Sequence, residues 1–343
     1  MQEILTLTSR HASLGLLMLV ITACTQPQST VTQVSEPRSR SEWTALVEDI
    51  RAFERRIGYR QTKNFIRFSE EKQAFPFCGY VSRLYLPYSY EDPAIQWLDS
   101  VTEEDCRALG GRGDVFFGES EALGESATPV TPSMLAAPLE RLLYLVMHED
   151  CHDQFALPHG IEEALCNVIA YNAMLAFSKE RYGSRSSEYR AAERYVREGS
   201  TYARVTVSFY QQLAALYARH HRLEVSTETL LRNRAPILIE AGRALAWEDG
   251  AMNNVLLANA MTYSRHYPFL DGVYEKLGRD LARTVACFKR MDEIKPSPAH
   301  VMKKHGLATD SGLDFIRTYE EAVVATIKNK LSELPRRCFS ERP

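Results

Sequence analysis

One pentapeptide constrains the fold of this chain more than any other feature. Residues 148–152 read His-Glu-Asp-Cys-His, an H-E-x-x-H sequence. Upstream of it, apolar residues at Leu139, Leu142, Leu143 and Val146 keep the spacing of one helical face. Two histidines four residues apart lie on the same face of a helix, about one turn apart. Both imidazoles can then reach one zinc ion, so the sequence predicts a buried helix that carries metal ligands.

The motif also predicts a role for the residue between the histidines. Glu149 stands beside His148 and His152, where its carboxylate can accept a proton from an attacking water. A catalytic zinc has three protein ligands and keeps its fourth position open. His159, Glu162 and Glu163 follow within one short link and are the candidates for the third ligand. The alternative to a zinc site is a buried helix with two structural histidines.

The second helix carries a resemblance to a known class of enzyme. Residues 162–167 read Glu-Glu-Ala-Leu-Cys-Asn. Together with H-E-x-x-H, this stretch resembles the gluzincin metallopeptidases, in which a glutamate on a following helix completes the site. The resemblance implies that Glu163 is the third ligand and that Asn167 replaces the aspartate that orients a ligand histidine. Glu162 and Asn167 depart from the N-E-x-x-x-D pattern, and an asparagine adds no negative charge to raise ligand basicity.

A further stretch resembles a group of bacterial predicted aminopeptidases, which also carry H-E-x-x-H and are often lipoproteins. It contains an N-N-x-x-L sequence from Asn253, then Thr262-Tyr263 and a segment from Phe269 to Tyr274. The resemblance implies that Tyr263 lines the cleft. A peptidase needs a donor where negative charge develops on the carbonyl oxygen. Tyr263 is the first candidate for that donor and His266 the second, against the alternative that both only pack in the core. Asn253 and Asn254 have the alternative role of capping a helix.

The N-terminus predicts a membrane anchor. Twelve apolar residues, 12–23, are too few to span a bilayer and suit a signal peptide. The run ends in Ile-Thr-Ala-Cys, which resembles a bacterial lipobox and implies cleavage after residue 23 and acylation of Cys24. A tether over 24–41 follows, rich in Ser, Thr, Gln and Pro. Thr25 in place of aspartate implies an outer-membrane location facing the periplasm. A buried N-terminal helix is the alternative.

The remaining cysteines fit an oxidising compartment, where disulfides persist. Besides Cys24 they stand at positions 78, 106, 151, 166, 287 and 338. Six cysteines allow fifteen connectivities. Cys78 with Cys106, and Cys287 with Cys338, are plausible pairs because each lies within one segment. Cys151 and Cys166 lie in the two helices that carry the proposed ligands, and we expect them off the metal-facing side, packed or paired with each other.

Periodicity predicts a mainly α (α+β) protein with a zincin-like core, a small β-sheet before the H-E-x-x-H helix and a large helical C-terminal part. The predicted helices cover about 42–57 (capped by Ser41), 138–155, 161–181, 186–219, 226–246, 252–264, 269–277, 279–292 and 312–331. Strands are predicted within 78–90 and over 114–118, and a loop over 119–133. We expect one metallopeptidase unit over 42–343, in which 42–182 holds the sheet and zinc helices and 183–343 forms a helical subdomain.

These observations predict a membrane-anchored metallopeptidase that uses one Zn²⁺ ion. Its expected partners are a peptide or protein substrate in the cell envelope and the lipid bilayer, reached through acylated Cys24. The formal net charge of -3 gives no reason to expect nucleic-acid binding. If the enzyme is an aminopeptidase, Glu119, Glu121 and Glu162 are candidates for holding the substrate's α-amine. The alternative function is that of a zinc-binding envelope lipoprotein without peptidase activity.

Overall fold

The fold is seen in a computed structural model, which describes residues 38–70, 75–99, 101–120, 127–248 and 250–333. The chain is mainly helical with one small antiparallel sheet, which confirms the predicted class. In order, the elements are α1 (Arg40–Arg56), β1 (Phe75–Val81), β2 (Gln96–Asp99), α2 (Glu103–Leu109), β3 (Asp114–Ser120), α3 (Pro132–Ala136), α4 (Leu139–His152), α5 (His159–Tyr182), α6 (Ser187–His221), α7 (Thr227–Ala244), α8 (Asn254–Ser264), α9 (Tyr267–Lys276), α10 (Leu281–Ile294), α11 (Pro298–His305) and α12 (Leu313–Glu333).

The structure corrects several local expectations. Ser39, not Ser41, caps α1, because Ser39 and Glu42 form a reciprocal capping box. The stretch 78–90 is a strand only up to Val81. After it the chain turns around Asp92, whose carboxylate accepts hydrogen bonds from the backbone N–H groups of Tyr88 and Ala94. The short elements β2, α2, α3 and α11 were not predicted, since four to eight residues give too little periodicity.

The sheet is held from two sides. Its strand order is β2-β1-β3, with β1 paired antiparallel to both neighbours. A side chain at Gly79 of β1 would meet the Trp97 ring at 2.6 Å and Val255 of α8 at 2.8 Å, so glycine permits α8 to approach the strand closely. On the other side, the Cys78–Cys106 disulfide ties β1 to α2. This pairing confirms the predicted one, whereas Cys338 lies outside the described residues.

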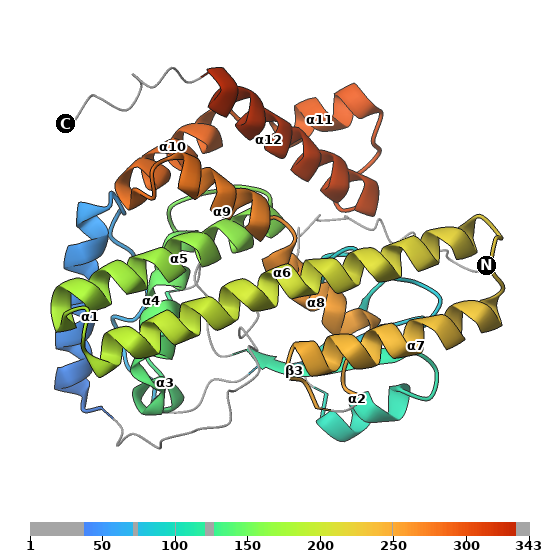
Figure 1. Cartoon of the computed structure of the whole chain (residues 1–343), viewed down its shortest axis with the longest axis horizontal. Helices are drawn as coiled ribbons and strands as arrows, with labels where there is room; N and C mark the ends of the chain where they lie inside the picture. The colour runs from blue at the N-terminus through green and yellow to red at the C-terminus, as the bar shows by residue number, and fades with distance from the viewer. Residues whose placement is uncertain (1–37, 71–74, 100, 121–126, 249, 334–343) are drawn as a thin grey trace, which may run out of the picture.

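Two apolar clusters form the interior. The first gathers side chains from α1, α4, α5 and the helices α9 to α12. The second joins the sheet to α7, α8 and the C-terminal half of α6. Helix α6 has 35 residues, contributes to both clusters and runs alongside α5 at one end and α7 at the other (Figure 1). The sheet and the motif helix α4 are therefore packed in different clusters that α6 connects.

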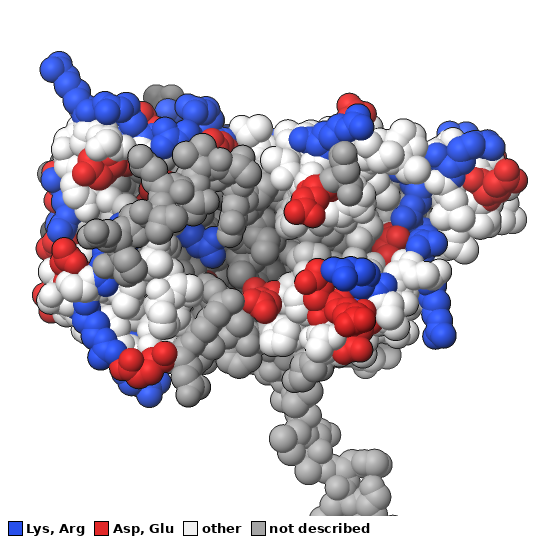
Figure 2. Space-filling view, turned by 90° about the horizontal axis from the view of Figure 1, so that it is seen from below, with Lys and Arg blue, Asp and Glu red and all other residues white. Residues whose placement is uncertain are grey.

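The distribution of surface charge and the character of the helices bear on possible partners. On the face shown in Figure 2, acidic and basic side chains are interspersed, without a broad field of one sign. Among the described residues, none of the helices combines the length and the apolar character needed to cross a bilayer.

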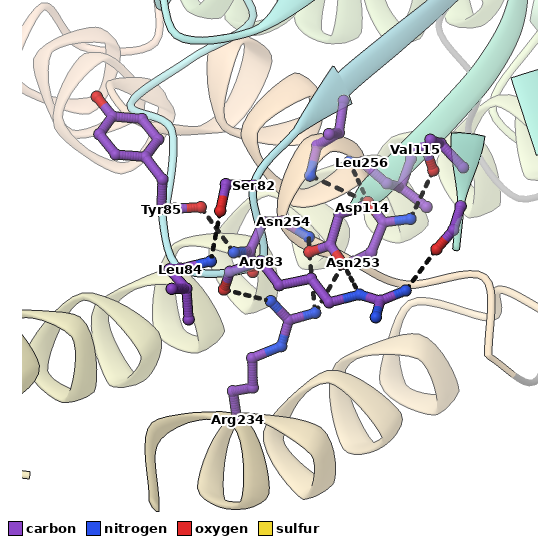
Figure 3. Close-up of polar contacts among 12 residues, drawn as sticks. Ser82, Arg83, Leu84, Tyr85, Asp114, Val115, Arg234, Asn253, Asn254 and Leu256 are labelled. Carbon is purple, nitrogen blue, oxygen red and sulfur yellow. Dashed lines mark hydrogen bonds and ion pairs between the residues drawn. The ribbon is translucent and has the colours of Figure 1, made fainter. Parts of the chain in front are cut away.

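A buried polar network joins the sheet to α7 and α8 (Figure 3). Arg234 of α7 donates from Nη2 to both carboxylate oxygens of Asp114 at 2.8 and 2.9 Å. The Asn254 backbone N–H donates to the same carboxylate at 3.0 Å, and its side chain donates to Tyr217 Oη at 2.6 Å. Asn253 caps α8, because its side chain accepts hydrogen bonds from two backbone N–H groups. This confirms the capping role that was predicted as the alternative. The N-N pair therefore fixes the start of α8.

This network gives a prediction for stability. Replacing Asp114 with Ala leaves Arg234 buried without its carboxylate partner, since both side chains are more than 90% buried. We expect the free energy of unfolding to fall by about 3–5 kcal/mol. Urea denaturation monitored by circular dichroism measures this loss. The control Asp310→Ala removes an exposed carboxylate and should change stability by less than about 0.5 kcal/mol. A loss of similar size in both variants would contradict the assigned role of the network.

Candidate metal centre

The site is built on the hairpin of α4 and α5. Pro138 and Pro158 precede the two helices, where a missing backbone N–H costs nothing. Residues 153–158 link them in a short loop. Cys151 and Cys166 are fully buried and form a disulfide between the helices. The bond joins α4 to α5 at the level of the candidate ligands. It confirms the expectation that these two cysteines pair with each other.

Three side chains of this hairpin converge on one point. His148 Nε2 lies 3.1 Å from Glu163 Oε2, and His152 Nε2 lies 3.2 Å from His148 Nε2. One ligand atom from each of the three residues lies within 4.8 Å of the others. His148 and Glu163 are only 2% and 6% exposed. Two imidazole nitrogens and one carboxylate are one of the donor sets found in catalytic zinc sites, so the residues present fit zinc and leave one coordination position open.

Hydrogen bonds on the far side of each ring set the tautomers needed for metal binding. Tyr144 Oη donates to Asn167 Oδ1 at 2.6 Å and therefore accepts from His148 Nδ1–H at 3.3 Å. His152 Nδ1–H donates to Glu162 Oε1 at 3.0 Å. In both rings the lone pair of Nε2 is thus free to face the metal position. Glu162 is held further by the Leu157 backbone N–H at 2.9 Å. Asn167 therefore reaches His148 through Tyr144, not by direct contact as the resemblance implied.

The carboxylates control protonation of the metal-free site. Burial opposes charge on His152, but the Glu163 and Glu162 carboxylates raise its pKa well above the ordinary value. Burial also opposes charge on Glu163, yet the positive charge of His152 holds its pKa well below the ordinary value. Metal-free protein therefore keeps an imidazolium–carboxylate pair where the metal would bind. A zinc ion must displace this proton.

This competition predicts how zinc affinity depends on pH. The folded-state pKa of His152 is raised above 6.5, so its proton remains bound at neutral pH in metal-free protein. The zinc Kd should fall about tenfold for each unit of pH increase between pH 6 and 7.5. In metal-free protein the same pair adds stability that is fully present between pH 4.5 and 6.5, the ordinary pKa values of its two groups. This stability is lost as pH rises through the raised pKa of His152 and as pH falls through the lowered pKa of Glu163. Competition with a chromogenic chelator measures the Kd, and an affinity independent of pH would contradict the proton assignment.

His159 contributes to the site without taking the metal position. Its Nε2 atom lies 2.6 Å from Tyr90 Oη and 3.3 Å from Glu163 Oε1. The carboxylate oxygen that faces His148 and His152 is the other one, Oε2. His159 therefore contacts the outer oxygen of Glu163, while the three convergent atoms come from His148, His152 and Glu163.

The motif helix is anchored from behind by the chain that follows α1. Asp150 accepts hydrogen bonds from the side chains of Thr62 and Asn64, and Asn64 also donates to the Glu149 carbonyl at 3.3 Å. Glu149 itself is 5% exposed, which places the predicted base in a low-dielectric environment. The two residues between Glu149 and His152 therefore hold the motif helix in place. Asp150 does so through hydrogen bonds, and Cys151 through a disulfide.

The predicted oxyanion donors lie at the junction of α8 and α9. Asn167 Nδ2 donates to the Tyr263 carbonyl at 3.4 Å, which brings this junction against α5. His266 Nε2 lies 2.8 Å from Glu320 Oε2 of α12, and Tyr88 Oη donates to the same oxygen at 2.7 Å. The structure thus holds His266 in a polar cluster with a buried carboxylate. The roles of Tyr263 and His266 stay predictions.

Several residues of the site were not predicted from the sequence. Tyr144 had a usable signal, because it precedes His148 by four residues and shares its helical face. Glu320 had none, since it stands far from the motif in a stretch without recognisable spacing. Of the three candidates for amine binding, Glu162 is engaged by His152, Glu119 is exposed near the end of β3, and Glu121 lies outside the described residues.

Comparison with known proteins assigns a family. The family model described as "Putative aminopeptidase" matches residues 65–301, which is more than half of the chain. The match includes the motif helix, Glu163 and the α8–α9 junction, while Glu320 lies beyond its end. A search of curated proteins and a search of solved structures each found no match. The chain belongs to the family described as "Putative aminopeptidase".

Proposed function

We propose that this protein is a zinc-dependent peptidase with its centre at His148, His152 and Glu163. The observation that carries the proposal is the convergence of these three ligand atoms within 4.8 Å on a buried hairpin, with Glu149 on the same helix. Family membership supports peptidase activity independently of that geometry. The orienting contacts from Tyr144 and Glu162 support a metal site over two merely structural histidines.

The chain's own residues divide the work of hydrolysis. When bound, zinc polarises a carbonyl and lowers the pKa of water. Glu149 accepts a proton from the attacking water and passes it to the leaving amine, which requires a carboxylate beside the ligand histidines. Tyr263 is the proposed donor to the oxygen that gains negative charge, with His266 as the second candidate. The Glu320 carboxylate fixes the orientation of the His266 ring through Nε2.

The proposed location is the cell envelope. Acylated Cys24 would anchor the protein to the outer membrane and present it to peptide substrates in the periplasm. These N-terminal residues lie outside the described ones, so the support comes from elsewhere. Two disulfides, Cys78–Cys106 and Cys151–Cys166, fit an oxidising compartment.

A peptide library tests the proposed activity. Zinc-loaded protein is incubated with a mixture of unblocked peptides, and the products are identified by mass spectrometry. We expect cleavage that stops with a chelator and returns after zinc is added back. Stoichiometric zinc binding without cleavage of any peptide would favour the non-enzymatic envelope lipoprotein instead.

A further inference from the structure

The Cys151–Cys166 disulfide has a fixed place relative to the proposed metal ligands. Cys151 follows His148 by three residues on α4. Cys166 follows Glu163 by the same interval on α5. Residues three apart on a helix are neighbours on its surface. The bond therefore joins the two helices next to a proposed ligand on each of them, with 5.5 Å between the two Cα atoms.

The same bond closes a short loop of chain that contains two of the three proposed ligands. The cysteines are 15 residues apart in the sequence, and His152 and Glu163 lie between them. Closing a loop with a disulfide removes conformations that the open chain would otherwise adopt. The bond therefore restricts ligands from two different helices before any metal is present.

The sulfur atoms of this pair lie in the close-packed interior. Both cysteines are fully buried and belong to the first apolar cluster, together with side chains of α1, α4 and α5. Reduction breaks the S–S bond and adds two electrons and two protons, which leaves two separate thiols. Two thiols need more room than a bonded pair, and a close-packed interior has little free volume. We therefore expect reduction to shift α4 relative to α5 beside the proposed ligands.

The other disulfide provides an internal comparison. Cys78–Cys106 is buried too, but it ties β1 to α2. Strand β1 contributes side chains to the second apolar cluster, whereas the three convergent ligand atoms come from α4 and α5. An effect on zinc that belongs to the first bond alone would therefore reflect the place of that bond, and not the loss of a cross-link in general.

We infer that the Cys151–Cys166 disulfide positions the zinc ligands, so that high-affinity zinc binding depends on oxidation of this pair. The inference rests on the proposed zinc centre. A disulfide that holds a binding site in its bound conformation raises affinity, because less ordering remains to be done on binding. Thiols stay reduced in the cytosol. At the proposed envelope location, exchange with an oxidised protein dithiol, which takes up the two electrons and two protons, completes the centre after export.

Zinc titration of matched disulfide variants tests this inference. Cys151→Ala/Cys166→Ala removes the bond together with both thiols, so that neither sulfur can bind zinc instead. Cys78→Ala/Cys106→Ala removes the other disulfide and is the control. Each metal-free protein is titrated with zinc against a chromogenic chelator, and urea denaturation of the same samples measures stability. In a further arm, the control variant is reduced with dithiothreitol, freed of the reductant without air, and titrated before and after reoxidation with oxidised glutathione.

We expect Cys151→Ala/Cys166→Ala to raise the zinc Kd about 10- to 100-fold, the loss typical of a contact that supports metal ligands. The control variant should bind zinc as tightly as wild type, although it also loses stability. Reduction should weaken zinc binding by a similar factor, and reoxidation should restore it. At saturating zinc the first variant should regain the wild-type KM, because the bond positions the metal ligands and not the substrate. If it does not fold, Cys151→Ala/Cys166→Val restores part of the lost volume and takes its place.

Three results would overturn the inference while leaving the proposed zinc centre intact. The first is an unchanged zinc Kd in Cys151→Ala/Cys166→Ala. The second is an equal loss of affinity in both disulfide variants, which would follow lost stability and not the place of the bond. The third is equally tight zinc binding by the reduced and the reoxidised samples. If oxidised wild type binds no zinc, the proposed function itself fails, and the inference that rests on it fails too.

Discussion

Replacing Glu149 with Gln should reduce peptide hydrolysis about 10²- to 10⁴-fold while zinc stays bound. Glutamine keeps the size of the side chain but cannot accept the proton of the attacking water, and general-base catalysis contributes a factor of this order. The three ligand atoms come from other residues, so the metal position is unchanged. Steady-state kinetics on one peptide, with elemental analysis of the same samples, measures both quantities.

Two comparisons make that result specific. Glu140→Gln alters a carboxylate in the first turn of the same helix, far from the ligands, and should retain wild-type turnover. Undiminished turnover by Glu149→Gln would contradict the assignment of the base. Loss of zinc together with activity would show instead that Glu149 supports the metal site and would leave its role as base unproven.

Removing the proposed third ligand should have the largest effect on metal binding. Glu163→Ala deletes the carboxylate that faces both Nε2 atoms, so we expect the zinc Kd to rise at least about 10³-fold and hydrolysis to become undetectable. Glu162→Ala is the matched comparison, since it removes the adjacent carboxylate, which orients His152 through Nδ1. Loss of an orienting contact typically costs about 10- to 100-fold in affinity.

Zinc titration of both variants with a competing chelator ranks the two glutamates. A greater loss of affinity in Glu162→Ala than in Glu163→Ala would reverse their roles. His159→Ala provides a third arm, because His159 contacts the outer oxygen of Glu163 and should change zinc affinity less than either glutamate. Together the three variants decide among the ligand candidates that the sequence left open.

The sequence predicts most of this fold because its long helices carry strong periodicity. The pair α4 and α5 was expected within a few residues of the observed bounds, since the apolar spacing and the motif itself agree. The convergence of His148, His152 and Glu163 follows from that hairpin. The short elements around the sheet gave weaker signals, and β2 has only four residues.

The parts of the site that come from distant segments were beyond such reasoning. Glu320 lies on α12 and reaches His266 across 54 residues of chain. Tyr90 lies in a loop whose course depends on hydrogen bonds to Asp92, and its hydroxyl contacts His159. Neither contact can be predicted from a fixed separation in the sequence, because the packing of separate elements decides which side chains meet. Asn167 was placed correctly on α5, but its link to His148 depends on Tyr144.

The measurement that tests the central claim most directly is a zinc titration of metal-free protein, with the rate of peptide hydrolysis recorded at each addition. The proposed ligands His148, His152 and Glu163 converge on a single position. The rate should therefore rise linearly and reach a plateau at one equivalent of zinc per chain. A rate that stays at the background level through the titration, or one that is already maximal in metal-free protein, would contradict the assignment of this hairpin as the zinc centre of a peptidase.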